Sequence, residues 1–302
     1  MISFKQLTYA LAIEKTLHFK KAAELCNVSQ SALSTAINNL EKQLGITIFE
    51  RNNKQVLITS HGQLILNKAK KIKIELDDLL QITQTGKQLF SSPMTIGVIP
   101  TIGPYLLPKV LPELRKQYPD FKLKIIEEQS HVLVAKVKSG AIDAAILALP
   151  YPIEGLMSFD FWQEDFHLVC HKDEPLSNAN EITSEEVALG QLMLLKDGHC
   201  LKEHVLSVCN FNYYKQESDF DSASLHTLIQ MVAGNIGTTF VPQMALDQLI
   251  YNESELKAVH LNAPGPHRTI AFIMRPNYVR TKELTILQAI FTKELTKKCH
   301  LN

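Results

Sequence analysis

The strongest constraint on the fold is an alternation of predicted strands and helices that begins after Ser91-Ser92-Pro93. Short apolar runs of strand length alternate with longer runs in which apolar residues recur every three or four positions. The first set predicts strands at 94–99, 123–127 and 144–149 and helices at 106–117 and 133–139. A chain with this alternation is expected to form an α/β fold, with helices packed on a mostly parallel sheet.

A second alternating set begins near Phe166 and predicts a second lobe. It predicts strands at 168–170, 192–195, 238–241 and 269–274 and helices at 224–233, at 243–249 and from 281 onward. Two crossovers, near residues 162 and 268, would join the lobes into a hinged cleft like that of type 2 periplasmic binding proteins. We expect lobe I at 93–162 and 268–302 and lobe II at 163–267. We interpret Trp162 as a packing residue and connect Arg268 with the cleft.

Residues 1–59 have a pattern that predicts a winged helix-turn-helix domain. Ser3 can cap a first helix, a short second helix starts at Phe19, and Ser29 can cap a third helix that Gly45 ends. The third helix has one apolar face and one face of small polar side chains, which can approach the edges of bases in a DNA groove. A polar tip between two short apolar runs predicts the wing. The predicted DNA contacts are Ser29, Gln30, Ser31, Ser34, Thr35, Asn38, Arg51 and Lys54.

The distribution of charge supports contact with a polyanion. The whole chain has a formal net charge of +0, but residues 1–90 hold 12 Lys and Arg against 7 Asp and Glu, a net +5. The remaining residues hold 19 against 24, a net −5. A basic N-terminal part fits DNA, although solvated helices also carry extra lysines.

Residues 60–90 predict one long amphipathic helix that links the two parts. An apolar stripe of near-heptad spacing runs along it through Leu64, Ala69, Ile72, Leu76, Leu79 and Leu80. A helix of this length with one apolar face needs a partner, which is either a second copy of the helix or another part of the same chain.

The segment from Asp197 to Cys209 holds two cysteines in one predicted helix. If the segment is helical, Cys200 and Cys209 lie roughly 13.5 Å apart along the axis, whereas a disulfide requires Cα atoms within about 7 Å. Pairing them would therefore require the helix to unwind. Cys200 falls at the helix start, beside His199 and Lys202, so it is the better candidate for a reactive thiolate.

Other interpretations of this segment stay open from the residues alone. Free cysteines are often small buried hydrophobic residues with no chemical role. His199, Cys200, His204 and Cys209 could also supply zinc ligands, but no Cys-x2-Cys pair accompanies them.

Composition favours a protein of the reducing cytoplasm. Five cysteines, an odd and irregularly spaced set, do not resemble a disulfide framework. The apolar stretches are short, and the N-terminal residues do not resemble a signal peptide. A chain of 302 residues with 45% hydrophobic residues is long enough for two or three domains with cores.

Several short motifs resemble those of LysR-type transcriptional regulators. The resemblance of the DNA-binding part covers residues 1 to about 66 and rests on four segments: Phe19-Lys20-Lys21-Ala22-Ala23, residues 28–34, Leu40-Glu41 with Leu44-Gly45, and Phe49-Glu50-Arg51. Residues 97–108, 146–149 and 197–200, together with Cys209, resemble the peroxide-sensing members of this family.

The resemblance implies a redox mechanism. Cys200 would react with hydrogen peroxide to a sulfenic acid, which Cys209 would capture as a disulfide. It also implies a peroxide pocket of Thr101, Ser130, His199 and Glu203, where Ser130 replaces the family's threonine and Glu203 its aspartate. Alternatively, Thr101 and Ser130 are only helix caps. The family's basic pair before Leu40 is here Asn38-Asn39, which removes potential DNA contacts.

The resemblance further implies partners. We expect a cytoplasmic activator of oxidative-stress genes that binds paired half-sites of double-stranded DNA and acts on RNA polymerase. The resemblance implies a homo-oligomer, most often a tetramer in this family. A thiol reductant would reset it. No cofactor, no metal and no enzymatic activity are expected. The alternatives are a regulator whose cleft binds a metabolite and a thiol peroxidase, although the chain lacks a thioredoxin-like Cys-x-x-Cys.

Overall fold

The computed structural model describes the chain except for residues 52–54, 86–88, 188–190, 212–223, 251–253 and 300–302. It forms two compact units, Met1–Gly86 and Lys87–Asn302, each of which is considered by itself. Within the described parts of the chain, no helix combines the length and hydropathy that a membrane span requires.

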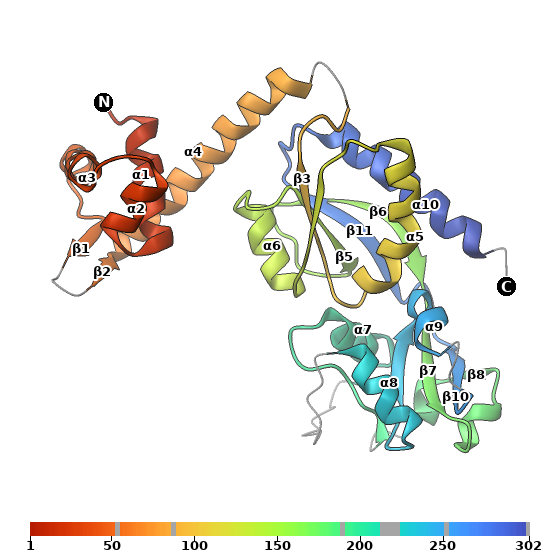
Figure 1. The fold of residues 1–302 in the computed structure, drawn as a ribbon. Coiled ribbons are helices and arrows are strands. Elements are labelled where there is room, and N and C mark those ends of the chain that lie inside the picture. The colour runs from red at the N-terminus through yellow and green to blue at the C-terminus, as the bar shows by residue number, and fades with distance from the viewer. Residues whose placement is uncertain (52–54, 86–88, 188–190, 212–223, 251–253, 300–302) are drawn as a thin grey trace. The chain divides into compact units, whose positions relative to one another are not determined.

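The N-terminal unit is a winged helix-turn-helix domain, as the sequence predicts (Figure 1). Its third helix buries Leu33, Ile37 and Leu40 against the first two helices. The Glu41 carboxylate accepts hydrogen bonds from the backbone N–H groups of Ile48 and Phe49, at 2.7 and 2.9 Å, and so fixes the start of the wing to this helix. The elements are α1 Phe4–Thr16, α2 Phe19–Leu25, α3 Gln30–Leu44, the antiparallel pair β1 Phe49–Arg51 and β2 Val56–Ile58, and α4 Ser60–Thr85.

The long helix α4 ends at Thr85, a few residues before the predicted end. The apolar residues of its stripe lie in two different environments. Ala69 is buried in the core of the N-terminal unit, where α4 packs on α1. Ile72 and Leu79, farther along, are 50% and 59% exposed, so these two residues of the stripe are left largely uncovered by the described residues of the chain.

The C-terminal unit consists of two lobes, each built on one sheet. Lobe I has five strands in the order β4-β3-β5-β11-β6, in which β3, β4 and β5 are parallel and β11 is antiparallel to its neighbours. Figure 1 shows α5 and α10 on one face of this sheet and α6 on the other. The elements are β3 Met94–Val98, α5 Gly103–Gln117, β4 Leu123–Glu127, α6 Ser130–Lys138, β5 Ala144–Leu149, β6 Met157–Glu164, β11 Arg268–Met274 and α10 Thr281–Cys299.

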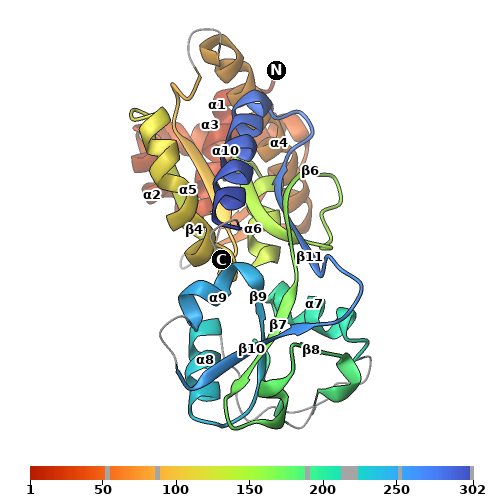
Figure 2. The ribbon, with the colours of Figure 1, turned by 90° about the vertical axis from the view of Figure 1, so that its right-hand side faces the viewer.

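Lobe II has four strands in the order β8-β10-β7-β9. Figure 2 shows the two crossovers that join it to lobe I, from β6 to β7 and from β10 to β11. The elements are β7 Phe166–His171, β8 Glu181–Ile182, α7 Cys200–Val208, α8 Leu225–Ala233, β9 Thr239–Pro242, α9 Gln243–Leu249 and β10 Leu256–Leu261, with short 3-10 turns at Pro175–Asn178 and Ser184–Glu186.

The structure corrects several predicted elements. The predicted strand at 192–195 is wrong: Leu192 forms only an isolated bridge with Thr238, because a short buried apolar run is equally compatible with an extended connection. The strands β6, β8 and β10 were not predicted. Helices α5 and α6 begin at Gly103 and Ser130, three residues before the predicted starts, because their first turns lack the apolar periodicity.

A buried ion pair anchors the first residues of lobe I. Glu283 pairs with Arg280 and accepts a hydrogen bond from the backbone N–H of Phe90 at 2.7 Å. Arg280 donates to the carbonyl oxygens of Pro93 and Ser92, at 2.8 and 2.9 Å. The ring of Phe90 packs on nearby aromatic rings of lobe I. The chain that follows α4 is therefore held against α10.

Candidate functional site

Helix α7 starts where the sequence predicts, at Cys200. Gly198 precedes it with a φ of 92°, a left-handed conformation that favours glycine. A Cβ at this position would lie 2.8 Å from the end of the flexible Gln129 side chain, which can move aside, so the backbone angle is the reason for glycine. Lys202 reaches back to Asp197 at 2.7 Å. The turn and the ion pair fix the first turn of the helix.

The thiol of Cys200 is buried and in contact with polar groups from lobe I. Burial raises the pKa of Cys200, while a hydrogen bond with Ser130 and the positive charge of Arg268 act in the opposite direction. Burial also lowers the pKa of His199, which favours its neutral form. The cation that lowers the pKa of Cys200 is Arg268, which the sequence did not identify for this role beside His199 and Lys202.

Arg268 is the centre of a buried network of hydrogen bonds. The sequence connects this residue with the cleft but does not predict its partners. Its side chain is fully buried and pairs with Glu164, with its second amino nitrogen 2.7 Å from the carboxylate. It also donates to the hydroxyl and the carbonyl oxygen of Thr101, at 3.3 and 3.2 Å. Glu164 in turn accepts from the backbone N–H of Met244 in lobe II, at 2.7 Å. The network lies where both crossovers meet lobe I.

Cys209 lies at the other end of α7 in a different environment. It is buried, and burial raises its pKa to about 12. Cys200 and Cys209 are both free thiols, and the intact helix α7 lies between them. The helical rise over nine residues is about 13.5 Å, so the two cannot bond in this conformation.

The structure brings together three of the four predicted pocket residues. All three are buried: Ser130 hydrogen bonds to Cys200, His199 directly precedes it in the chain, and Thr101 and His199 line a common cavity. Glu203 is exposed on α7 and does not line that cavity. The alternative that Thr101 and Ser130 are helix caps is wrong, because Ile102 and Gln129 occupy the cap positions of α5 and α6.

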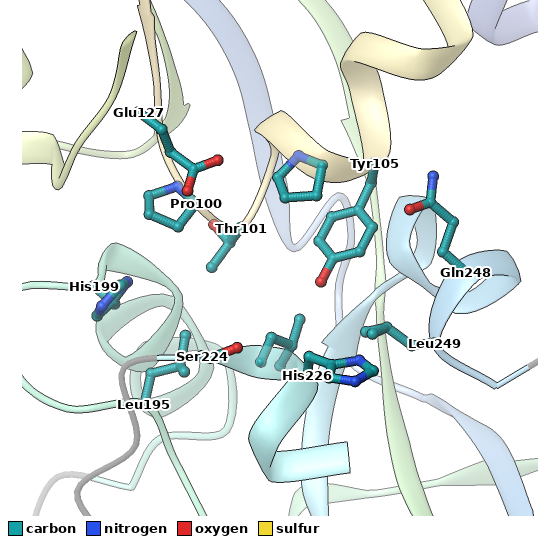
Figure 3. Close-up of a pocket in the computed structure, with 12 residues that line it drawn as sticks. Pro100, Thr101, Tyr105, Glu127, Leu195, His199, Ser224, His226, Gln248 and Leu249 are labelled. Carbon is teal, nitrogen blue, oxygen red and sulfur yellow. The ribbon is translucent and has the colours of Figure 1, made fainter. Parts of the chain in front are cut away.

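A cavity of about 430 Å³ lies between the lobes beside this site. Thr101 and His199 belong to its wall. Figure 3 shows the Tyr105 hydroxyl directed into the space toward His226, with Glu127 above Thr101. Burial raises the pKa of Tyr105 to about 12, so its hydroxyl stays protonated and can donate or accept a hydrogen bond.

The four residues of the zinc alternative do not converge. Among the residues that the structure describes, no three His, Cys, Asp or Glu side chains form a group that could hold a metal ion. His204 instead hydrogen bonds to the carbonyl oxygen of Pro150.

Most of the predicted DNA contacts belong to helix α3 or to its N-cap. Ser29 caps α3 and accepts from the backbone N–H of Ala32 at 3.2 Å. Ser34 is partly buried, Arg51 belongs to strand β1, and Lys54 lies outside the described residues. The exposed residues among the predicted contacts of α3 and its N-cap are Ser29, Gln30, Ser31, Thr35 and Asn38.

Comparison with known families decides what this combination of domains is. Residues 4–63 match the model of bacterial regulatory helix-turn-helix proteins of the lysR family, and residues 87–295 match the LysR substrate binding domain. The chain belongs to the LysR family of transcriptional regulators. The winged helix-turn-helix and the two-lobed α/β unit, both predicted from the sequence, are thereby confirmed as the domains of a LysR-type protein.

Individual LysR-type relatives are similar over nearly the whole chain. The HTH-type transcriptional regulator EstR of Acinetobacter baylyi is 34% identical over 99% of this chain and 98% of its own length. The hydrogen peroxide-inducible genes activator of Haemophilus influenzae is 34% identical over 91% of both chains. A structure of a full-length OxyR variant from Pseudomonas aeruginosa has a TM-score of 0.78 and 31% identity, covering 96% of this chain and 95% of that one.

Proposed function

We propose that this LysR-type regulator senses hydrogen peroxide through Cys200 and Cys209 and switches the expression of oxidative-stress genes. Overall identity does not identify the signal, since EstR and the peroxide-inducible activator are equally similar to the chain. The observation that carries the proposal is local. A buried thiol contacts the Ser130 hydroxyl and lies near Arg268, and a second thiol ends the same helix.

The first chemical step is oxidation of Cys200. The thiolate sulfur attacks one oxygen of hydrogen peroxide, the O–O bond breaks, and the leaving oxygen takes up a proton to become water. The product is Cys200 sulfenic acid. Arg268 stabilises the thiolate, and the hydroxyls of Ser130 and Thr101 can pass a proton to the leaving oxygen. The negative charge of Glu203, on the exposed face of α7, raises the pKa of Cys200 and so opposes formation of the thiolate.

The second step forms the disulfide. The Cys209 sulfur attacks the sulfenic sulfur, and the hydroxyl leaves as a second water. Because α7 separates the two cysteines, this step requires at least part of the helix to unwind. A cellular thiol reductant, acting by thiol–disulfide exchange, would return both cysteines to thiols.

The resulting change in lobe II would alter how the N-terminal unit binds DNA. The exposed polar face of α3 and the wing are the elements that would contact paired half-sites, with Arg51 and Lys54 near the phosphates. The exposed Ile72 and Leu79 of the α4 stripe favour a dimer through this helix. Two such dimers would give a cytoplasmic tetramer that contacts RNA polymerase at the promoters it activates.

The test is peptide mass mapping under non-reducing conditions after brief exposure of the full-length protein to peroxide. We expect a bond between Cys200 and Cys209. Cys170 serves as an internal control, because it is another buried thiol, with a pKa raised by burial to about 11, and should stay reduced. Oxidation of Cys170 at the same rate, or no Cys200 modification, would exclude the proposal.

A second candidate function rests on the cavity between the lobes, whose volume suits a small metabolite. In that case the cysteines would be incidental. DNA protection that depends on a metabolite and does not change with peroxide would favour this alternative.

A further inference from the structure

His204 lies within α7, between the two cysteines and one turn after Cys200. His204 is only 4% exposed, and its Nε2 lies 2.8 Å from the carbonyl oxygen of Pro150, directly after strand β5 of lobe I. The hydrogen bond therefore ties a helix of lobe II to lobe I. No step of the proposed peroxide reaction uses this imidazole.

The other ring nitrogen of His204 is buried without a partner. Nε2 must carry the proton in order to donate to a carbonyl oxygen, so Nδ1 is an acceptor, and no described residue donates to it. A second proton would have to reside on Nδ1, in a site without an acceptor. The reduced helix thus holds His204 in its neutral form.

The surroundings of His204 also favour its neutral form. Burial is the main cause that lowers its pKa, to about 4; the hydrogen bond to Pro150 opposes this, and Arg268 of β11 lowers the pKa further. On its own helix, Cys200 lies one turn before it and Glu203 beside it. Tyr151 follows Pro150 in lobe I and carries a phenol whose pKa is raised by burial.

We propose that His204 is a positioning residue of the redox switch, which holds the reduced helix against lobe I and takes up a proton when the helix unwinds to form the disulfide. The inference rests on the proposed function, because it needs the Cys200–Cys209 bond. It makes the balance between thiols and disulfide depend on pH as well as on the oxidant.

The sign of the dependence follows from proton linkage. In the folded helix His204 is neutral down to a pH of about 4, whereas a solvated imidazole has a pKa of about 6.5. Between these values the unwound form binds one more proton, so the helix loses stability as the pH falls below about 6.5. From pH 7.5 to 5.5 this favours the disulfide by about tenfold.

The equilibrium is measured in glutathione buffers, in which two glutathione molecules reduce the disulfide and become one glutathione disulfide. The exchange of thiols for disulfides itself consumes no net proton while all the thiols stay protonated. A change of the equilibrium constant with pH therefore reports proton uptake by other groups of the protein. We expect the equilibrium constant of the wild type to shift by at least tenfold toward the protein disulfide between pH 7.5 and 5.5. His199 can add to that shift, since its pKa is also lowered by burial.

The variant His204→Gln keeps an N–H donor for Pro150 but cannot titrate. We expect its shift to be about tenfold smaller than that of the wild type, with the remainder due to His199. The matched control is His131→Gln, which removes an exposed imidazole from α6 and should leave the wild-type shift intact. Equal shifts in wild type and His204→Gln would overturn the inference, whereas absence of any Cys200–Cys209 bond in the wild type would overturn the proposed function instead.

A measurement on the wild type alone covers the case in which the variant does not fold. Exchange of the imidazole carbon-bound hydrogen with deuterium reports the pKa of each histidine by mass spectrometry. Trypsin cleaves after Lys202, so His199 and His204 fall in separate peptides. We expect the pKa of His204 to rise from about 4 in the reduced protein to about 6.5 after oxidation. The same low pKa in both forms would contradict the proposal.

Discussion

The two units of this chain place their candidate functional side chains in opposite environments. On α3 of the N-terminal unit, residues such as Gln30 and Thr35 are exposed, and the apolar core lies on the other face of the helix. In the C-terminal unit, Cys200, Ser130 and Arg268 are buried. A surface that binds DNA needs accessible donors and acceptors, whereas a thiol that responds to a small oxidant can be shielded from larger molecules. Substitutions should therefore affect binding in one unit and stability or reactivity in the other.

The largest effect is expected at Cys200. Cys200→Ser should abolish the peroxide response, because it removes the attacking sulfur. Cys209→Ser should still react but stop at sulfenic acid or at a mixed disulfide with another thiol. Trapping of the sulfenic acid with a dimedone probe, followed by mass spectrometry, distinguishes the two. Cys170→Ser is the matched control and should respond like the wild type; a Cys200→Ser protein whose DNA binding still changes with peroxide would contradict the scheme.

The α4 stripe differs from both sites just compared, because its residues Ile72 and Leu79 are apolar and exposed. The double variant Leu76→Glu and Leu79→Glu should dissociate the dimer, since an interface there would bury unpaired charge at a cost of several kcal/mol. Sedimentation velocity measures the change. Asn67→Glu, on the opposite side of the helix, should leave the oligomer intact. An unchanged oligomer in the double variant would show that α4 is not the interface.

Variants of Arg268 test how strongly a buried ion pair contributes to the stability of the C-terminal unit. Arg268→Met should lower the free energy of unfolding by about 3–5 kcal/mol, because Glu164 would be left buried without its charged partner. Adding Glu164→Gln should restore part of that loss. Urea denaturation of the three proteins gives the values. A loss below about 1 kcal/mol for Arg268→Met would mean that water reaches Glu164.

The smallest effects are expected on α3. Thr35→Ala and Asn38→Ala should each weaken binding to the specific DNA site by about 1–3 kcal/mol and leave the urea midpoint unchanged, because both residues are exposed. Fluorescence anisotropy at a fixed salt concentration measures the affinity. Gln43→Ala, at the far end of the same helix, serves as the control. Loss of stability instead of affinity would show that the α3 face is structural.

The same contrast explains what could be predicted from the sequence. The exposed face of α3 follows from the spacing of Leu33, Ile37 and Leu40, which is local information. The start of α7 follows from Gly198 and the apolar spacing after Cys200, and the structure confirms it. In both cases a few neighbouring residues determine the result.

Contacts between distant segments could not be predicted in this way. Arg268 meets Thr101 across 167 positions and Glu164 across 104, and no local pattern encodes either pairing. The charge state of His199 depends on its burial, which the sequence does not show. Glu203 was placed in the pocket by resemblance alone, and its position on α7 leaves it exposed.

The ion pair of Arg280 and Glu283 determines which lobe carries the end of the linker. The backbone N–H of Phe90 donates to Glu283, and the carbonyl oxygens of Ser92 and Pro93 accept from Arg280, so all three residues are fixed to lobe I. Lobe I is therefore the lobe to which the linker is joined, whereas both cysteines belong to a helix of lobe II. A change that begins with the unwinding of α7 would therefore have to pass through the interface between the lobes, or through lobe II of another copy of the chain, before it reaches the linker.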